Sequence, residues 1–266
     1  MQLSIIAGFV ISFGALCLSV MIESEWNIHA LGAFFNQSAM ITIFGGISGV
    51  IVVAFPVDEL KEIPGALKKA FMNVEGVNMV VMANKLLALA QKSRQEGILA
   101  LEGELPNLED DWMRKGLQMV VDGIDRAVIR DVMEQELDEF SRKIGIGPEI
   151  FQQLGGFAPT LGIIGTVMGL VNMLAHMEDA SKLGGAISVA FLATFWGILS
   201  ANLIFLPIAA RIKVKNTELS LTRQAMIEGI LSIHAGESVR ILEEKLKVFM
   251  NHEQREKFDT ERATPA

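Results

Sequence analysis

Two threonines, Thr166 and Thr194, are the side chains of this 266-residue chain that are best placed for chemistry. Both stand in long uncharged segments, where a hydroxyl oxygen can face a partly dehydrated cation. The pair could therefore line an ion pathway or coordinate the ion. A threonine in an apolar helix more often hydrogen-bonds a carbonyl of its own helix, and the sequence leaves both interpretations open.

Small residues recur around these threonines at helical spacing. They stand three or four positions apart in residues 157–176 and again in residues 184–210. Such stripes allow two membrane helices to approach each other, or a partner, closely, and ordinary packing is the simplest interpretation. We predict a helix-packing role for five residues of the stripes: Gly162, Gly165, Gly169, Ala190 and Gly197.

The uncharged segments offer no carboxylate for ion transport. There are four of them, and none contains Asp, Glu, Lys or Arg: residues 3–22, 38–55, 157–176 and 184–210. An ion pathway through a membrane normally requires an ionisable residue. If this chain takes part in ion conduction, a partner must therefore supply the titrating group.

Enzyme motifs are missing from the sequence. The four histidines are scattered, without HExxH spacing, and there is neither a phosphate-binding glycine loop before a lysine nor a nucleophile elbow. The single cysteine, Cys17, excludes a disulfide framework and is expected to be a small apolar residue. The net charge of −8 argues against nucleic acid as a main partner. We predict that the chain is not an enzyme and uses no cofactor.

The four uncharged segments predict membrane-spanning helices. Each is long enough to cross a hydrocarbon core of about 30 Å. Of the 23 Lys and Arg residues, 22 lie either between the second and third segments or after the fourth, and only Lys182 lies in an outer connection. The positive-inside rule therefore predicts that both termini are cytoplasmic. The first segment lacks a basic n-region and is expected to be a retained span.

The expected fold is an all-α membrane protein with four transmembrane helices and a helical cytoplasmic domain inserted between helices 2 and 3. We assign residues 1–55 to helices 1 and 2, and residues 56–150 to the inserted domain with an interfacial helix at 60–71. Residues 151–210 form helices 3 and 4, which would line the ion path, and residues 211–266 form cytoplasmic helices ending in a frayed segment from 259. Apolar periodicity predicts helices over 75–105, 112–144, 212–234 and 239–258. Gly145, Gly147 and Pro148 are expected to end the second of these.

Several strings of the sequence resemble the flagellar stator A subunit, the MotA/PomA family of the MotA/TolQ/ExbB superfamily. KSRQEGILALE at residues 92–102 is similar to that family's cytoplasmic torque segment, and FP at 55–56 followed by ELK at 59–61 is similar to its span 2 exit. FAPTLGIIGTVMGL at 157–170 resembles its third span, and Thr194, Gly197 and LPIA at 206–209 resemble its fourth. The similarity extends over about residues 1–225.

The resemblance implies a motor in the bacterial inner (plasma) membrane. In it a homo-oligomeric ring of A subunits, a pentamer, surrounds a dimer of a MotB/PomB-type B subunit. That subunit has a single span, which carries the ion-binding Asp. Ion flow past the Asp drives rotation of the ring, which acts on the rotor switch protein FliG.

The resemblance also implies roles for individual residues. Arg94 and Glu102 match residues that contact the rotor, and they would share one broad face of a continuous helix, roughly 80° apart. Pro159 and Pro207 match prolines that couple ion passage to movement, although simple kinking would also explain them. Thr166 stands where sodium-driven relatives tend to have threonine, so Na⁺ is favoured over H⁺ as the transported ion.

Three other classes of protein compete with a stator subunit. The main alternative is an ExbB/TolQ-like energiser of envelope transport, but that group typically has three spans and a periplasmic N-terminus. An independent channel or secondary transporter is disfavoured by the lack of an intramembrane charge and of inverted-repeat hydropathy. A membrane enzyme is disfavoured because no catalytic constellation is present.

Overall fold

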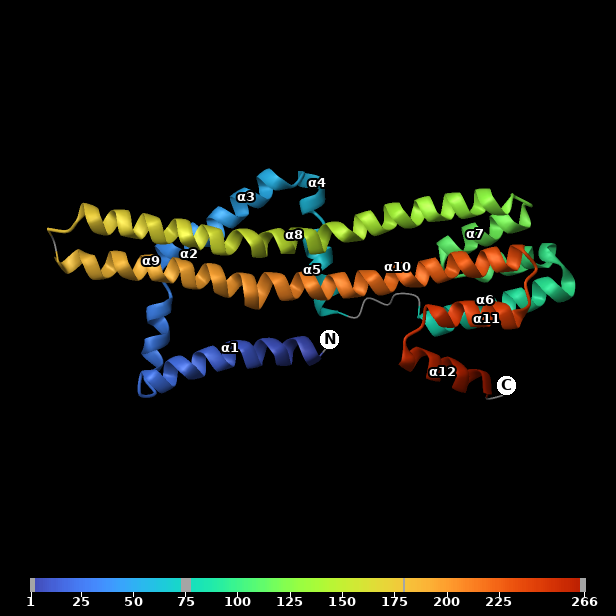
Figure 1. Ribbon diagram of the computed structural model, residues 1–266, viewed down its shortest axis with the longest axis horizontal. Helices are drawn as coiled ribbons and strands as arrows, with labels where there is room; N and C mark the ends of the chain where they lie inside the picture. Colours follow the sequence, from blue (N-terminus) through green and yellow to red (C-terminus); the bar gives the residue numbers. More distant parts are fainter. Residues whose placement is uncertain (1–2, 73–77, 179, 264–266) are drawn as a thin grey trace. The chain divides into compact units, whose positions relative to one another are not determined.

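The computed structural model of the chain describes residues 3–72, 78–178 and 180–263, and all regular structure in these ranges is helical (Figure 1). The chain divides into two compact units. We call Met1–Val74 with Gly145–Val214 the span unit, and Glu75–Ile144 with Lys215–Ala266 the polar unit.

The span unit begins with α1 (Leu3–Glu23) and a 3₁₀ segment, η1 (Ile28–Phe34). The second span follows as three pieces: α2 (Gln37–Met40), the π-helical η2 (Ile41–Gly45) and α3 (Gly46–Ala54). Two short helices come next, α4 (Val57–Leu60) and α5 (Ile63–Phe71). The unit also holds the later part of α8 (Arg126–Ala175), α9 (Ala180–Ser200), the π-helical η4 (Ala201–Phe205) and the start of α10 (Leu206–His234).

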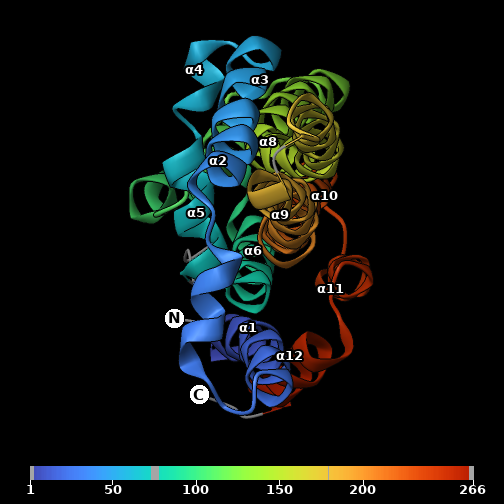
Figure 2. The same cartoon turned by 90° about the vertical axis from the view of Figure 1, so that its left-hand side faces the viewer.

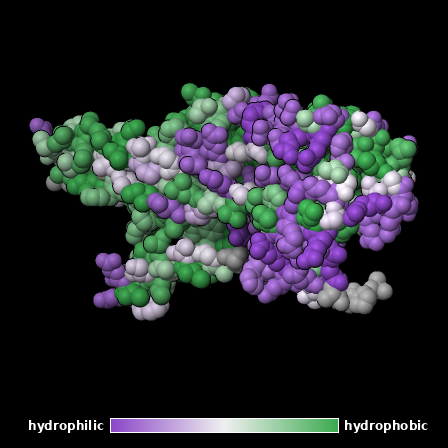
Figure 3. All heavy atoms as spheres, turned by 45° about the vertical axis from the view of Figure 1, so that its right-hand side comes forward, coloured by the Kyte–Doolittle hydropathy of each residue, from purple (hydrophilic) through white to green (hydrophobic). Residues whose placement is uncertain are grey.

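Four helices are long and apolar enough to cross a membrane: Ile5–Glu23, Gln37–Ala54 and segments of Arg126–Ala175 and Leu183–His234. Large apolar side chains on them remain exposed in the single chain, such as Ile163 on α8 (61%) and Phe191 on α9 (71%). In Figure 3, hydrophobic residues, coloured green, cover a large part of the visible surface. The predicted all-α fold with four membrane-spanning helices is therefore confirmed.

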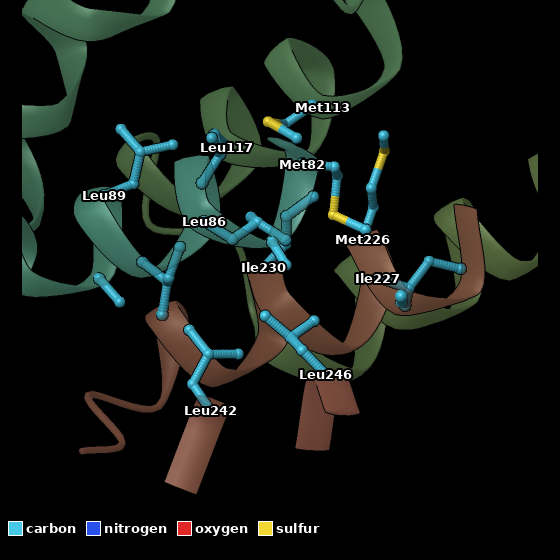
Figure 4. Packing of buried hydrophobic residues seen from close by; sticks show 14 of the residues in the cluster. Met82, Leu86, Leu89, Met113, Leu117, Met226, Ile227, Ile230, Leu242 and Leu246 are labelled. Carbon is cyan, nitrogen blue, oxygen red and sulfur yellow. The ribbon is translucent and has the colours of Figure 1, made fainter. Parts of the chain in front are cut away.

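The polar unit consists of α6 (Met79–Glu96), the 3₁₀ segment η3 (Ile98–Asn107), α7 (Asp111–Val121), α11 (Val239–Val248), α12 (His252–Ala263), and the remaining parts of α8 and α10. Its core is built from large side chains that α6, α7, α10 and α11 contribute (Figure 4). Leu86, Leu117, Ile230 and Leu246 are all fully buried. Burial of such apolar side chains is the main contribution to the folding free energy of a helical unit in water.

The predicted helix over 112–144, and its predicted end at Gly145–Pro148, are both wrong. Gly123, with φ of +72°, follows the end of α7 at Val121, and the Asp125 carboxylate accepts from the Ala127 N–H (2.8 Å) to start α8. From there α8 continues unbroken to Ala175.

Pro148 is tolerated inside α8 because another group replaces the hydrogen bond that a proline cannot make. Proline has no N–H, so the carbonyl of Ile144, four residues earlier, loses its helical donor. The Asn216 side-chain amide donates to that carbonyl instead. Periodicity within one segment cannot reveal this bond, since Asn216 stands 72 residues along the chain.

The other helix boundaries predicted from periodicity also needed correction. Residues 75–77 lie outside the described ranges, and the rest of the predicted 75–105 helix is broken at Gly97, whose φ is +90°. The expected helix at 212–234 is not separate, since α9, η4 and α10 follow one another without an intervening loop. The expected 239–258 helix is two helices, because Asn251 and Gln254 bond each other's backbone N–H at the start of α12. The expected frayed end at 259 is wrong in part, since α12 extends to Ala263.

Candidate ion pathway between helices α8 and α9

Helices α8 and α9 approach so closely that several positions between them accept only glycine. Figures 1 and 2 show the two helices side by side. A Cβ atom added to Gly197 would lie 2.6 Å from the carbonyl oxygen of Ala158, and one added to Gly162 would lie 3.1 Å from the Cα of Thr194. We call this contact the α8–α9 seam; it comprises Ala158, Gly162, Gly165 and Gly169 with Ala190, Ala193, Thr194 and Gly197.

All five residues predicted to pack helices together lie in the seam. A Cβ on Gly165 would lie 2.5 Å from the Ala193 Cβ, and a Cβ on Gly169 would lie 2.7 Å from the Ala190 Cβ. Gly162, Gly165, Gly169, Ala190 and Gly197 are all buried in the single chain. Close approach of backbones is the arrangement that small residues permit between helices in lipid.

The seam also brings the two threonines together. The Thr166 and Thr194 hydroxyls contact each other, and both reach the carbonyl of Gly162, at 3.0 Å from Thr166 and 3.3 Å from Thr194. The Thr166 hydroxyl also lies 3.2 Å from the carbonyl of Ala190 on α9. Both side chains are half-buried. Thr166 therefore bonds a carbonyl of its own helix, whereas Thr194 reaches across the seam to Gly162 on α8.

This cluster of oxygens can donate and accept but cannot titrate. Each hydroxyl has one proton, which a backbone carbonyl or the other hydroxyl can accept, and this leaves oxygen lone pairs for water or a cation. Among the described residues, no three His, Cys, Asp or Glu side chains gather in a way that could hold a metal ion. The seam can therefore provide oxygen ligands along a path, but the charge that makes such a path selective must come from elsewhere.

A second wall of the seam comes from the second span, which the sequence did not indicate. The Thr42 methyl group lies 3.4 Å from the position of a Cβ on Gly165, and Leu161 packs against Gly46. Trp196 anchors η1, because its indole N–H donates to the carbonyl of Phe34 (2.7 Å). A tryptophan within an apolar run, which needs a partner for its N–H, was the available sequence signal.

The two prolines predicted to couple ion passage to movement occupy different surroundings. Pro159 is half-buried in α8, directly after Ala158, whose carbonyl faces Gly197. Pro207 is the second residue of α10, follows the π-helical η4 and lines a separate pocket with Phe9 and Phe71. A π turn interrupts the regular hydrogen-bond ladder, and this accommodates a residue without an N–H.

The predicted rotor-contact residues, Arg94 and Glu102, are both exposed on the polar unit. The two residues do not share one helical face as predicted, because Gly97 ends α6 between them and Glu102 lies in η3. An ion pair ties the two elements together instead: Lys92 Nζ lies 2.5 Å from Glu104 Oε1. The hydrogen bond from Lys92 lowers the pKa of Glu104, and the same bond raises the pKa of Lys92.

Comparison with known proteins identifies the family. Residues 104–225 match the MotA/TolQ/ExbB proton channel family. The motility protein A of Bacillus subtilis is 34% identical over 251 residues, which cover 94% of this chain and 92% of that protein.

Two solved structures share the fold. The flagellar MotAB stator complex from Bacillus subtilis contains a chain with a TM-score of 0.83 and 33% identity, covering 95% of this chain and 98% of that one. The C. jejuni MotAB structure gives a TM-score of 0.84 at 26% identity, with 95% and 97% coverage. These relatives are flagellar motor proteins, and the family is one of proton channels and not of enzymes. The chain is a flagellar stator A subunit by family, a member of the MotA/PomA group within the MotA/TolQ/ExbB proton channel family.

Proposed function

We propose that this chain couples ion flow across the inner membrane to rotation of a flagellar stator ring. The observation that carries the proposal is the α8–α9 seam, where two hydroxyls meet between helical segments, residues 157–176 and 184–210, that contain no carboxylate. An ion can be guided by such oxygens, but a titrating group is needed for directional coupling. A seam of this composition therefore suits a subunit that works with a carboxylate from a partner.

The partner is a MotB/PomB-type B subunit with a single span that carries an Asp. The two solved relatives are MotAB complexes, which supports this pairing. We propose that five copies of this chain form a ring around two copies of the B subunit. Exposed apolar residues on α8 and α9, among them Val167, Val171 and Phe191, provide surface for contacts with the partner, with other copies or with lipid.

The ring is oriented with both termini and the polar unit in the cytoplasm. The near absence of Lys and Arg from the outer connections supports this orientation. Movement driven by the Asp would pass through Pro159 and Pro207, where the helical ladder lacks a donor. The exposed side chains of Arg94 and Glu102 would contact the rotor protein FliG.

Sodium is the proposed ion, with Thr166 and Thr194 lining its path. The experiment that tests ion and function together measures the swimming speed of a stator-deleted host that receives this chain and its genomic neighbour. Sodium is varied at fixed pH, and a proton uncoupler is then added. Speed that follows sodium and survives the uncoupler supports the whole proposal. Speed that ignores sodium and stops with the uncoupler keeps the motor and makes the ion H⁺.

Rotor contact is tested separately by Arg94→Glu. Because Arg94 is exposed, its reversal should leave the yield of the membrane complex unchanged while motility falls under load. Arg240→Glu, at another exposed position of the polar unit, is the control. Normal torque from the Arg94→Glu variant would remove this residue from the rotor surface.

A further inference from the structure

The span unit contains a pocket that shares no residue with the α8–α9 seam. It has a volume of about 240 Å³ and is lined by α1, the end of α5, η4 and the start of α10. Its wall is mainly apolar, with Phe9, Phe71, Leu203 and Ile208 among the lining residues. Arg211, Ser12 and Asn202 are its polar members. A pocket of this kind suits a ligand with a long apolar part and a small polar end.

The positive charge of Arg211 favours a ligand whose polar end is negatively charged. Its Nε atom is buried and has no hydrogen-bond partner within the part of the chain that the structure describes. A guanidinium stays charged at any physiological pH and presents donors that match a phosphate. Because the Nε atom is enclosed by the chain, a phosphate in the pocket would contact the other N–H groups of the guanidinium.

The position of the pocket along the span fits a lipid. Arg211 is the first charged residue after the uncharged segment 184–210, so it marks the edge of the apolar span. Asn202, at the other end of the lining, is nine residues away, about 13 Å at 1.5 Å per residue. The last turn of α5, beside the pocket residues Ala70 and Phe71, carries Lys68 and Lys69. Basic pockets between helices on the cytoplasmic side attract anionic headgroups.

We propose that this pocket binds an anionic phospholipid, whose phosphate contacts Arg211 and whose acyl chain lies along Leu203, Phe9 and Phe71. Gly8 lines the pocket, and a Cβ added there would meet no atom within 4 Å. A Cβ atom therefore fits at position 8 without a clash, and we expect a larger side chain there to take up part of the space for the acyl chain. The pocket does not include Thr166 or Thr194, the two residues proposed to line the ion path.

The test uses the full chain purified in a neutral detergent and native mass spectrometry with phosphatidylglycerol or phosphatidylcholine added. Wild type should retain phosphatidylglycerol at least about fivefold better than phosphatidylcholine, a difference of roughly 1 kcal/mol. Arg211→Gln should remove this preference, whereas Arg240→Gln, which removes an exposed charge of the polar unit, should keep it. Gly8→Leu should lower retention of both lipids. Inorganic phosphate should not compete, because it has no acyl chain.

Three outcomes would overturn the proposal. One is equal lipid retention by Arg211→Gln and Arg240→Gln. Another is displacement of the lipid by inorganic phosphate alone, which would indicate a simple anion site. The third is efficient cross-linking of two copies through a photoreactive residue at Phe9, without lipid retention, which would show that a second copy fills the pocket. Circular dichroism and gel filtration confirm that each variant is folded, and Gly8→Leu keeps the test decisive if Arg211→Gln does not fold.

Discussion

The α8–α9 seam and the core of the polar unit are both tightly packed, but they bury residues of opposite size. The seam brings backbone against backbone through Gly162, Gly197 and their neighbours. The polar unit instead buries Leu86, Met226 and Ile230, all 1% exposed or less (Figure 4). In water, removing large apolar surface from the solvent stabilises a fold. In lipid that gain is lost, so close approach and interhelical hydrogen bonds must stabilise the contact.

The comparison predicts that the largest stability effects come from truncation in the polar unit. Leu86→Ala should cost about 2–5 kcal/mol, because a fully buried side chain leaves a cavity between α6 and Gly229 on α10. Hydrogen exchange of the full chain in detergent should then show faster exchange throughout α6. Leu99→Ala, at a position that is 72% exposed, should change little. Equal protection in both variants would mean that this core does not limit the stability of the unit.

The seam should respond in the opposite direction, to enlargement and not to truncation. Gly197→Ala should cost about 1–3 kcal/mol, because the new methyl group would lie 2.6 Å from the Ala158 carbonyl, and backbone cannot rotate away. The yield of folded complex, measured by gel filtration, should fall. Gly185→Ala lies on the same helix with nothing within 4 Å and is the matched control. Normal yield from Gly197→Ala would contradict the packing assigned to the seam.

The hydroxyls of the seam should matter more for function than for stability. Thr166→Val keeps the shape of the side chain but removes the hydroxyl contacts with Gly162, Ala190 and Thr194, at a cost of about 0.6 kcal/mol per hydrogen bond in membranes. On the proposed function, swimming should be strongly reduced while the complex still assembles, and Thr166→Ser should swim. If Thr166→Val swims normally across sodium concentrations, its hydroxyl is only a packing group.

The smallest effect is expected at the ion pair between α6 and η3. The lowered pKa of Glu104 means that this residue stabilises the fold above its ordinary value of 4.5 and loses that contribution as pH falls below it. The raised pKa of Lys92 means that its contribution is present below 10.5 and is lost as pH rises further. Protection factors in η3 should therefore be constant near neutral pH and decrease at both extremes. Glu104→Gln should remove the decrease on the acid side.

The sequence alone was sufficient to predict the parts of the fold that the surrounding bilayer dictates. Four segments without charge have to be helices in a bilayer, since no other isolated segment satisfies its backbone there. The residues of the small-residue stripes lie where α8 and α9 meet. Both inferences rest on local composition, which can be determined from one segment without knowing its distant contacts.

Bonds between distant residues decided what the sequence left open. Pro148 was expected to end a helix, but the Asn216 amide satisfies the carbonyl of Ile144 and α8 continues. The meeting of Thr166 and Thr194, and the enclosure of Arg211 beside α1, likewise depend on segments far apart in the chain. Each backbone or side-chain polar group needs a partner, but the sequence does not say which distant group provides it. Only the tertiary structure makes that choice, and with it the position of the candidate ion path.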